Sequence, residues 1–121
     1  MVKTYEVDVT VARYASSGSI ASVPVNGYLK GIKATAGTMD DNDTYTLAIT
    51  DKHSATVFSR ASLADAGVTT IWADKYNELS TTKVEGALLN TPMAGDITVT
   101  ITPSTQQDAA AVAYSIVIYY E

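Results

Sequence analysis

The sequence predicts an all-β protein of roughly seven to eight short antiparallel strands, arranged as a β-sandwich, a jelly roll or a small barrel. Three observations support this fold class. Apolar and polar residues alternate along several segments, and turn-forming residues separate these segments at regular intervals. No stretch of useful length shows the apolar spacing of about 3.6 residues that is typical of a helix.

The N-terminal part of the chain begins with a clear strand pattern at Lys3–Ala12. Its apolar row consists of Tyr5, Val7, Val9 and Val11. Successive side chains of a strand point to opposite faces, so this row is expected to face the core. The stretch Ala15–Val25 contains serines, a glycine and a proline, and it is expected to be the longest flexible connection.

The middle of the chain contains further strand candidates, which are Tyr28–Thr35, Thr44–Asp51, Ala55–Arg60, Thr69–Trp72 and Val84–Asn90. In the second of these, three large apolar residues alternate with threonines, which favour half-exposed strand positions. The separators, such as Ala36-Gly37 and the acidic run at 40–43, have ordinary turn chemistry. Residues 61–66 could hold one turn of helix.

The last two strands are predicted at Asp96–Thr102 and Ala110–Glu121. One row of the final strand consists of Val112, Tyr114, Ile116, Ile118 and Tyr120. The opposite row still carries Val117 and Tyr119, so neither face is fully polar. A strand of this kind has to be covered on both sides, which predicts that another layer or another chain packs on it.

The composition bounds the possible functions. A chain of 121 residues is predicted to be a single domain, 1–121. The absence of cysteine excludes disulfides, thiolate catalysis and cysteine-based zinc sites. Eight basic against 13 acidic residues give a formal net charge of −5, so nucleic-acid binding is not expected. No apolar run approaches the roughly 20 residues of a membrane span, and no signal peptide is visible, so synthesis in the cytoplasm is expected.

Catalytic chemistry has weak support in the sequence. His53 is the only histidine, and it lies in Asp51-Lys52-His53-Ser54, where a hairpin turn is expected. Adjacent His53 and Ser54 do not form the base and nucleophile geometry of a triad by adjacency alone. Among the glutamates, no pair is singled out as the two carboxylates of a glycosidase. We therefore expect a protein that is not an enzyme and needs no cofactor.

Two clusters could bind a ligand. Asp40, Asp41 and Asp43 form the densest carboxylate group, but the glycine and closing glutamate of an EF-hand loop are missing, so a solvated turn is favoured over a calcium site. Trp72 and Tyr76 could stack on a sugar, anchor a subunit contact, or close one end of the sandwich. Four tyrosines lie in apolar rows and are expected in the core: Tyr28, Tyr45, Tyr114 and Tyr120.

Several segments occur in an order that resembles the small jelly-roll decoration (cement) proteins of tailed-bacteriophage heads. They are Val25–Ile32, Tyr45–Asp51, the Trp72 segment, Pro92–Thr100 and Val117–Glu121. The matching motifs are a Gly-x-Leu-x-x-Ile strand, a strand that ends in Ile-Thr-Asp, a Gly-Asp-Ile-Thr-Val strand and a terminal tyrosine-rich strand. The resemblance covers most of the chain from about Val25 onward and narrows the predicted fold to an antiparallel jelly roll.

The resemblance implies a homotrimer on the exterior of the capsid that bridges subunits of the major capsid protein and stabilises the head. Trp72, Val117 and Tyr119 are then the candidate interface residues, and residues 1–5 could form an arm to a neighbour. Two alternatives stay open. One is another virion subunit from a tail, neck or fibre, because one fold serves several positions. The other is a carbohydrate-binding module that uses Trp72 and Tyr76 with calcium at Asp41 and Asp43.

Overall fold

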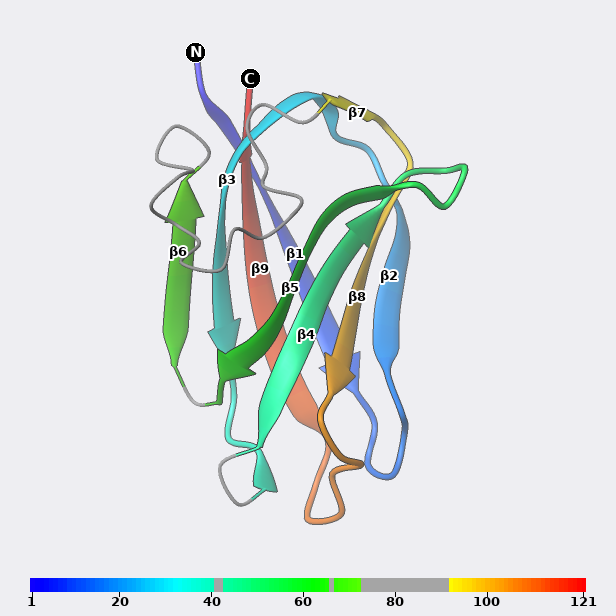
Figure 1. Ribbon diagram of the computed structural model, residues 1–121, viewed down its shortest axis with the longest axis vertical. Coiled ribbons are helices and arrows are strands. Elements are labelled where there is room, and N and C mark those ends of the chain that lie inside the picture. The colour runs from blue at the N-terminus through cyan, green and yellow to red at the C-terminus, as the bar shows by residue number, and fades with distance from the viewer. Residues whose placement is uncertain (41–42, 66, 73–91) are drawn as a thin grey trace.

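The computed structural model describes residues 1–40, 43–65, 67–72 and 92–121, and within these ranges it contains nine strands (Figure 1). The strands are β1 (Lys3–Val11), β2 (Gly18–Val23), β3 (Asn26–Ala36), β4 (Thr44–Thr50), β5 (Thr56–Ala64), β6 (Val68–Trp72), β7 (Pro92–Ala94), β8 (Ile97–Pro103) and β9 (Val112–Tyr120). The described residues contain no helix long and apolar enough to cross a membrane.

The strands form two antiparallel sheets that face each other (Figure 1). The first sheet has the order β1-β9-β3-β6, with the short β7 paired to the start of β3, and the second has the order β2-β8-β4-β5. The pairs are nested along the chain, because β4 pairs with β5, β3 with β6, β2 with β8 and β1 with β9. This is one long antiparallel ribbon folded over into two sheets, which is the jelly roll. The predicted fold class is therefore confirmed.

The core lies between the sheets and is built by the alternating rows that the sequence predicts. In β4 and β8 every second residue is buried, and in β9 the row from Val112 to Ile118 is buried. Tyr120 ends that row and packs against the core while staying partly exposed. The first strand contributes Val7, Val9 and Val11, whereas Tyr5 near its beginning is exposed. Burial of these rows supplies the main driving force for folding.

Two large core side chains meet across the sandwich. Tyr45 of β4 and Tyr114 of β9 have ring centroids 4.9 Å apart with their planes tilted by 56°. Their hydroxyl groups are buried and have no hydrogen-bond partner. Burial raises the pKa of each phenol to about 12, and for Tyr114 the neighbouring Tyr45 and Asp43 add to this rise. Both tyrosines therefore belong to the core, as predicted.

Gly27 allows the end of the chain to pair closely with the beginning of β3. Tyr28 of β3 and Glu121 exchange two backbone hydrogen bonds, with N···O distances of 2.9 and 3.0 Å. The residue before Tyr28 is Gly27, whose φ is +128°, and a Cβ atom at this position would lie 2.5 Å from the backbone oxygen of Glu121. Only a residue without a side chain fits this backbone at such a close approach.

Three further local predictions differ from the structure, and one short strand is not predicted. The expected connection at Ala15–Val25 contains β2, whose side chains are mostly exposed and so lack an alternating pattern. Residues 61–64 belong to β5 rather than to a helical turn, and the strand continues past a register shift against β4 with Ser62 at φ 60°. Tyr28 is 53% exposed and is not a core residue. The three residues of β7 pair with β3 and have no recognisable pattern. The predicted strand Val84–Asn90 lies outside the described residues.

The N-terminal residues are part of the first sheet. Lys3, Thr4 and Tyr5 pair with the end of β9, opposite Tyr120, Tyr119 and Ile118. An arm formed by residues 1–5 would therefore have to leave this pairing before it could reach a neighbour.

Candidate functional site

Val117 and Tyr119 lie in β9, inside the first sheet, on the row that points away from the core. Both side chains are half-buried. The register places Val117 between Glu6 of β1 and Lys33 of β3, so opposite charges flank it on its two sides. Side chains directly opposite each other on neighbouring strands share one face of the sheet. The result is a small apolar centre with a charged border, which is the pattern of an interface core and its rim.

Trp72 is brought to the same sheet by strand pairing. It is the last residue of β6 and lies opposite Gly31 of β3. On its other side Gly31 lies opposite Tyr119 of β9. The backbone register therefore aligns Tyr119, Gly31 and Trp72 in one row across three strands, with Val117 two residues along β9. Tyr76, the second aromatic residue of the sugar-binding hypothesis, lies outside the described residues.

We call the outward side of the first sheet around Val117 and Tyr119 the β9 face. Hydrogen bonding fixes part of its charged border. The hydroxyl Oγ of Ser115 donates to Oε2 of Glu6 at 2.9 Å. Asp8 lies opposite Ser115 on the same row of the sheet. The β9 face thus combines the apolar pair Val117 and Tyr119 with carboxylates on one side and Lys33 on the other.

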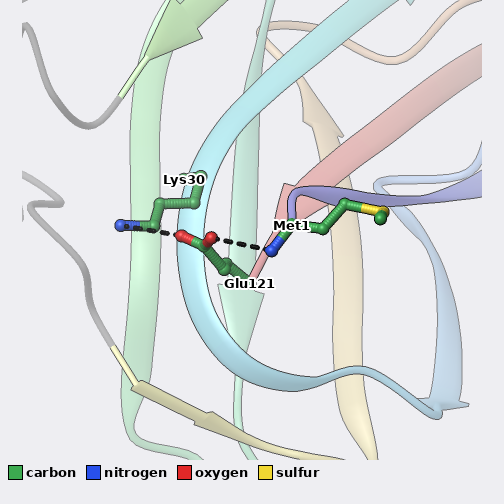
Figure 2. A network of polar contacts seen from close by, with 3 residues as sticks. All are labelled: Met1, Lys30 and Glu121. Carbon is green, nitrogen blue, oxygen red and sulfur yellow. Dashed lines mark hydrogen bonds and ion pairs between the residues drawn. The ribbon is translucent and has the colours of Figure 1, made fainter.

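Met1 and Glu121 lie close together at the end of the first sheet where β1 begins and β9 ends (Figure 2). The α-amino group of Met1 donates to Oε2 of Glu121 at 3.0 Å, and Nζ of Lys30 lies 3.6 Å from Oε1 of the same carboxylate. The hydrogen bond and the charge of the amino group, followed by the charge of Lys30, hold the pKa of Glu121 below its ordinary value. Glu121 therefore links the beginning of the chain, its end and β3.

His53 lies exposed in the turn between β4 and β5. The side chain of Asp51 caps this turn, because its Oδ1 accepts hydrogen bonds from the backbone amides of His53 at 2.8 Å and Ala55 at 2.9 Å. These two bonds are the main reason why the pKa of Asp51 lies below its ordinary value. The Asp51 carboxylate thus serves the backbone of the turn and does not orient the imidazole.

Asp40 and Asp43 are engaged by the loop between β8 and β9. Oδ2 of Asp43 accepts hydrogen bonds from the Thr105 hydroxyl and from Nε2 of Gln107, the latter at 2.9 Å. Both bonds lower the pKa of Asp43. Oδ2 of Asp40 accepts a bond from the backbone amide of Asp108 at 2.7 Å. The two aspartates therefore brace neighbouring loops.

The calcium hypothesis depends on Asp41 and Asp43. Asp41 lies outside the described residues. Within the described part of the chain, no group of three or more histidine, cysteine or acidic side chains could hold a metal ion. An open hollow of about 480 Å³ lies beside the cluster and is lined by Thr38, Met39, Asp40, Asp108, Ala109 and Ala110.

Gln107 connects the residues of this cluster by hydrogen bonds, and the sequence analysis does not predict this role. Its side chain is fully buried. Oε1 accepts a hydrogen bond from the Asp40 amide at 2.6 Å, and Nε2 donates to Asp43 and to the Thr105 carbonyl at 3.0 Å. The backbone oxygen of Gln107 also accepts a bond from the Tyr14 amide at 2.8 Å. The run Ser-Thr-Gln-Gln-Asp reads as an exposed turn, and only the distant partners of Gln107 reveal that it is buried.

No protein-family model matches this sequence, and no curated protein matches it. Among solved structures, a chain of the cyanophage Pam1 capsid asymmetric unit is similar, with 22% identity, a TM-score of 0.55, and coverage of 99% of this chain and 85% of that chain. A chain from the acid-stable capsid of the Helicobacter pylori bacteriophage KHP30 has 10% identity, a TM-score of 0.46, and coverage of 100% and 94%. The carbohydrate-binding module CBM36, in complex with calcium and xylotriose, has 9% identity, a TM-score of 0.44, and coverage of 95% and 87%. The likeness to the Pam1 chain supports the jelly-roll fold.

Proposed function

We propose that this chain is a non-catalytic structural protein of a bacteriophage virion, and that it decorates and stabilises the head by bridging subunits of the major capsid protein. The observation that carries the proposal is the jelly roll with an apolar strip on the outside of one sheet. The structure it resembles at a TM-score of 0.55 is a component of a cyanophage capsid. The order of sequence motifs independently resembles phage decoration proteins.

The β9 face is the part of the molecule that we assign to partner binding. Val117 and Tyr119 are half-buried in the isolated chain, and a partner that covers them removes the remaining apolar surface from water. Completing the burial of such a side chain stabilises a complex by about 1 kcal/mol. Glu6 and Lys33 on either side of Val117 offer charges of both signs, which fix the orientation of the partner more than they add affinity.

The finer features of the proposal follow from the resemblance. The chain is a single domain, 1–121, made in the host cytoplasm, and it assembles as a homotrimer on the outside of the head, with Trp72 adjoining the β9 face at the contact. Light scattering coupled to size-exclusion chromatography measures the number of chains. A stable trimer supports this assembly, whereas a monomer requires that copies come together only on the shell.

Binding to heads tests the proposal directly. The purified chain is added to expanded, undecorated heads of the phage that encodes it, and bound protein is measured after sedimentation of the heads. We expect saturable binding that falls at least several-fold in the double variant Val117→Ser, Tyr119→Ser. The control is Tyr14→Ser, which removes an exposed tyrosine from the opposite end of the sandwich. Absence of binding by the wild-type chain would refute the decoration role.

A different virion position is the main alternative. A tail, neck or fibre subunit could use the same fold and the same sheet face. Separating heads from tails of disrupted virions and detecting the chain with an antibody distinguishes these positions. Recovery of the chain in the tail fraction would move the proposal from the head to the tail without changing its class.

A further inference from the structure

The outside of the second sheet has an unusually uniform surface. In β4 and β8 the buried residues alternate with residues that point away from the core. Strand register pairs these outward residues directly, as Thr46 with Thr102, Ala48 with Thr100 and Thr50 with Thr98. We call these six residues the threonine face. The two flanking strands add further hydroxyl groups to this face, because Ser19 of β2 lies opposite Thr100 and Ser59 of β5 lies opposite Ala48.

This face carries no charge at any of the positions just named, although the chain has 13 acidic and 8 basic residues. The outward rows of the first sheet contrast with it, because they include Glu6, Asp8 and Lys33. Two copies of a chain with a formal charge of −5 repel each other overall. Contact through the threonine face brings none of these carboxylates together, so it adds no like-charge repulsion at the positions named.

The threonine face is also chemically complementary to itself. A threonine hydroxyl both donates and accepts hydrogen bonds, so a hydroxyl on one copy can pair with a hydroxyl on another. A two-fold contact between identical chains requires such self-complementarity, because each surface patch meets its own copy. The central row, with Ala48 beside Thr100, has small side chains that allow two sheets to approach to the usual spacing of about 10 Å. We propose that the threonine face binds the threonine face of a second copy of this chain, in a two-fold contact that is separate from the contacts within a trimer.

The size of the face predicts a weak contact. Four strands of about seven residues cover roughly 19 by 24 Å, or about 450 Å² on each copy, at the usual strand spacing and rise. Stable interfaces bury about 800 Å² on each partner. The paired state is therefore expected to be minor in dilute solution and to form where copies are concentrated, as on an assembled shell.

Cysteine cross-linking tests this pairing, and the absence of native cysteine makes it clean. Thr100→Cys places one thiol near the centre of the face, and a bismaleimide that spans about 10 Å matches the spacing of two packed sheets. The control is Ser16→Cys in the exposed loop between β1 and β2, where random collisions are at least as frequent. At high protein concentration we expect cross-linked dimer to form several-fold faster from Thr100→Cys than from Ser16→Cys.

A second substitution distinguishes a specific contact from a reactive thiol. Thr98→Lys in the Thr100→Cys background places like charges across the two-fold contact, and it should return the cross-linking rate to that of the control. Equal rates for the two cysteine variants, or a rate that Thr98→Lys leaves unchanged, would overturn the proposal. Binding of Thr98→Lys to phage heads is measured in parallel, because it tests the decoration role separately from pairing between copies.

Discussion

Substitution of Gln107 tests how much its hydrogen bonds stabilise the loops at the end of the sandwich opposite to the chain termini. Its buried side chain makes three hydrogen bonds, to the Asp40 amide, the Asp43 carboxylate and the Thr105 carbonyl. Each such bond contributes about 1 kcal/mol net. Water can replace part of what is lost, because the partner groups lie near the surface. We therefore expect Gln107→Ala to lower the free energy of unfolding by about 1–3 kcal/mol, or the melting temperature by roughly 10 °C.

Gln107→Glu adds a dependence on pH. The substitution keeps an acceptor for the Asp40 amide but places a second carboxylate where Nε2 lies 2.9 Å from Oδ2 of Asp43. Repulsion raises the pKa of the introduced acid in the folded state above its unfolded value of about 4.3. The variant is therefore relatively more stable below this value and loses stability as the pH rises through the folded-state pKa.

Urea unfolding followed by tryptophan fluorescence and circular dichroism measures both effects between pH 4 and pH 8. The matched controls are Gln106→Ala and Gln106→Glu, since Gln106 is the exposed neighbour of Gln107. Surface substitutions of this kind usually change stability by less than about 0.5 kcal/mol. A loss of less than about 0.5 kcal/mol in Gln107→Ala would refute the reasoning. So would a Gln107→Glu variant whose deficit does not grow with pH.

Three further substitutions or measurements test other parts of the fold. Gly27→Ala should destabilise the chain by about 1–3 kcal/mol in urea unfolding, because its Cβ would collide with backbone rather than with a movable side chain. Tyr45→Phe should be neutral or stabilising by up to about 1 kcal/mol, because it removes a buried hydroxyl that has no partner; a clear loss would reveal a partner. In an NMR titration, the side-chain carboxyl of Glu121 should show a pKa below its ordinary value. Acetylation of the Met1 amino group should raise this pKa. Because this pKa is lowered on folding, the small stabilisation is present above the ordinary pKa and is lost as the pH falls through the folded-state value.

The sequence predicts the interior strands well because their burial is a local pattern. In β4, β8 and β9 one face is covered by the opposite sheet, so every second residue has to be apolar. The strand β2 escapes this logic, because it lies at a sheet edge and leaves Ser19, Ile20 and Ala21 exposed. Tyr28 belongs to an apparently apolar row, so the sequence predicts that it lies in the core. It is exposed because it lies where β3 pairs with β7 and the chain end.

The candidate site depends on pairings that no local pattern specifies. Tyr119 and Trp72 are far apart in the chain, and they come to one row only because both pair with Gly31. The burial of Gln107 likewise requires Asp40 and Asp43 from a distant loop. Alternation identifies which residues of a strand face outward, but the composition of a whole sheet face emerges only when the register is known.

The two outer faces differ in a way that suits two kinds of neighbour. A face with an apolar centre and charges of both signs fixes the orientation of a partner whose charges match its pattern. A face of hydroxyl groups carries no charge pattern that a partner has to match, and its hydroxyls can pair with those of its own copy. A subunit that is added to a shell needs both capacities, since it lies on a different protein and beside copies of itself. We therefore assign the β9 face to a different protein and the threonine face to a second copy. Exchange of Lys33 for Glu should weaken only the binding to heads, while Thr98→Lys should weaken only the contact between copies.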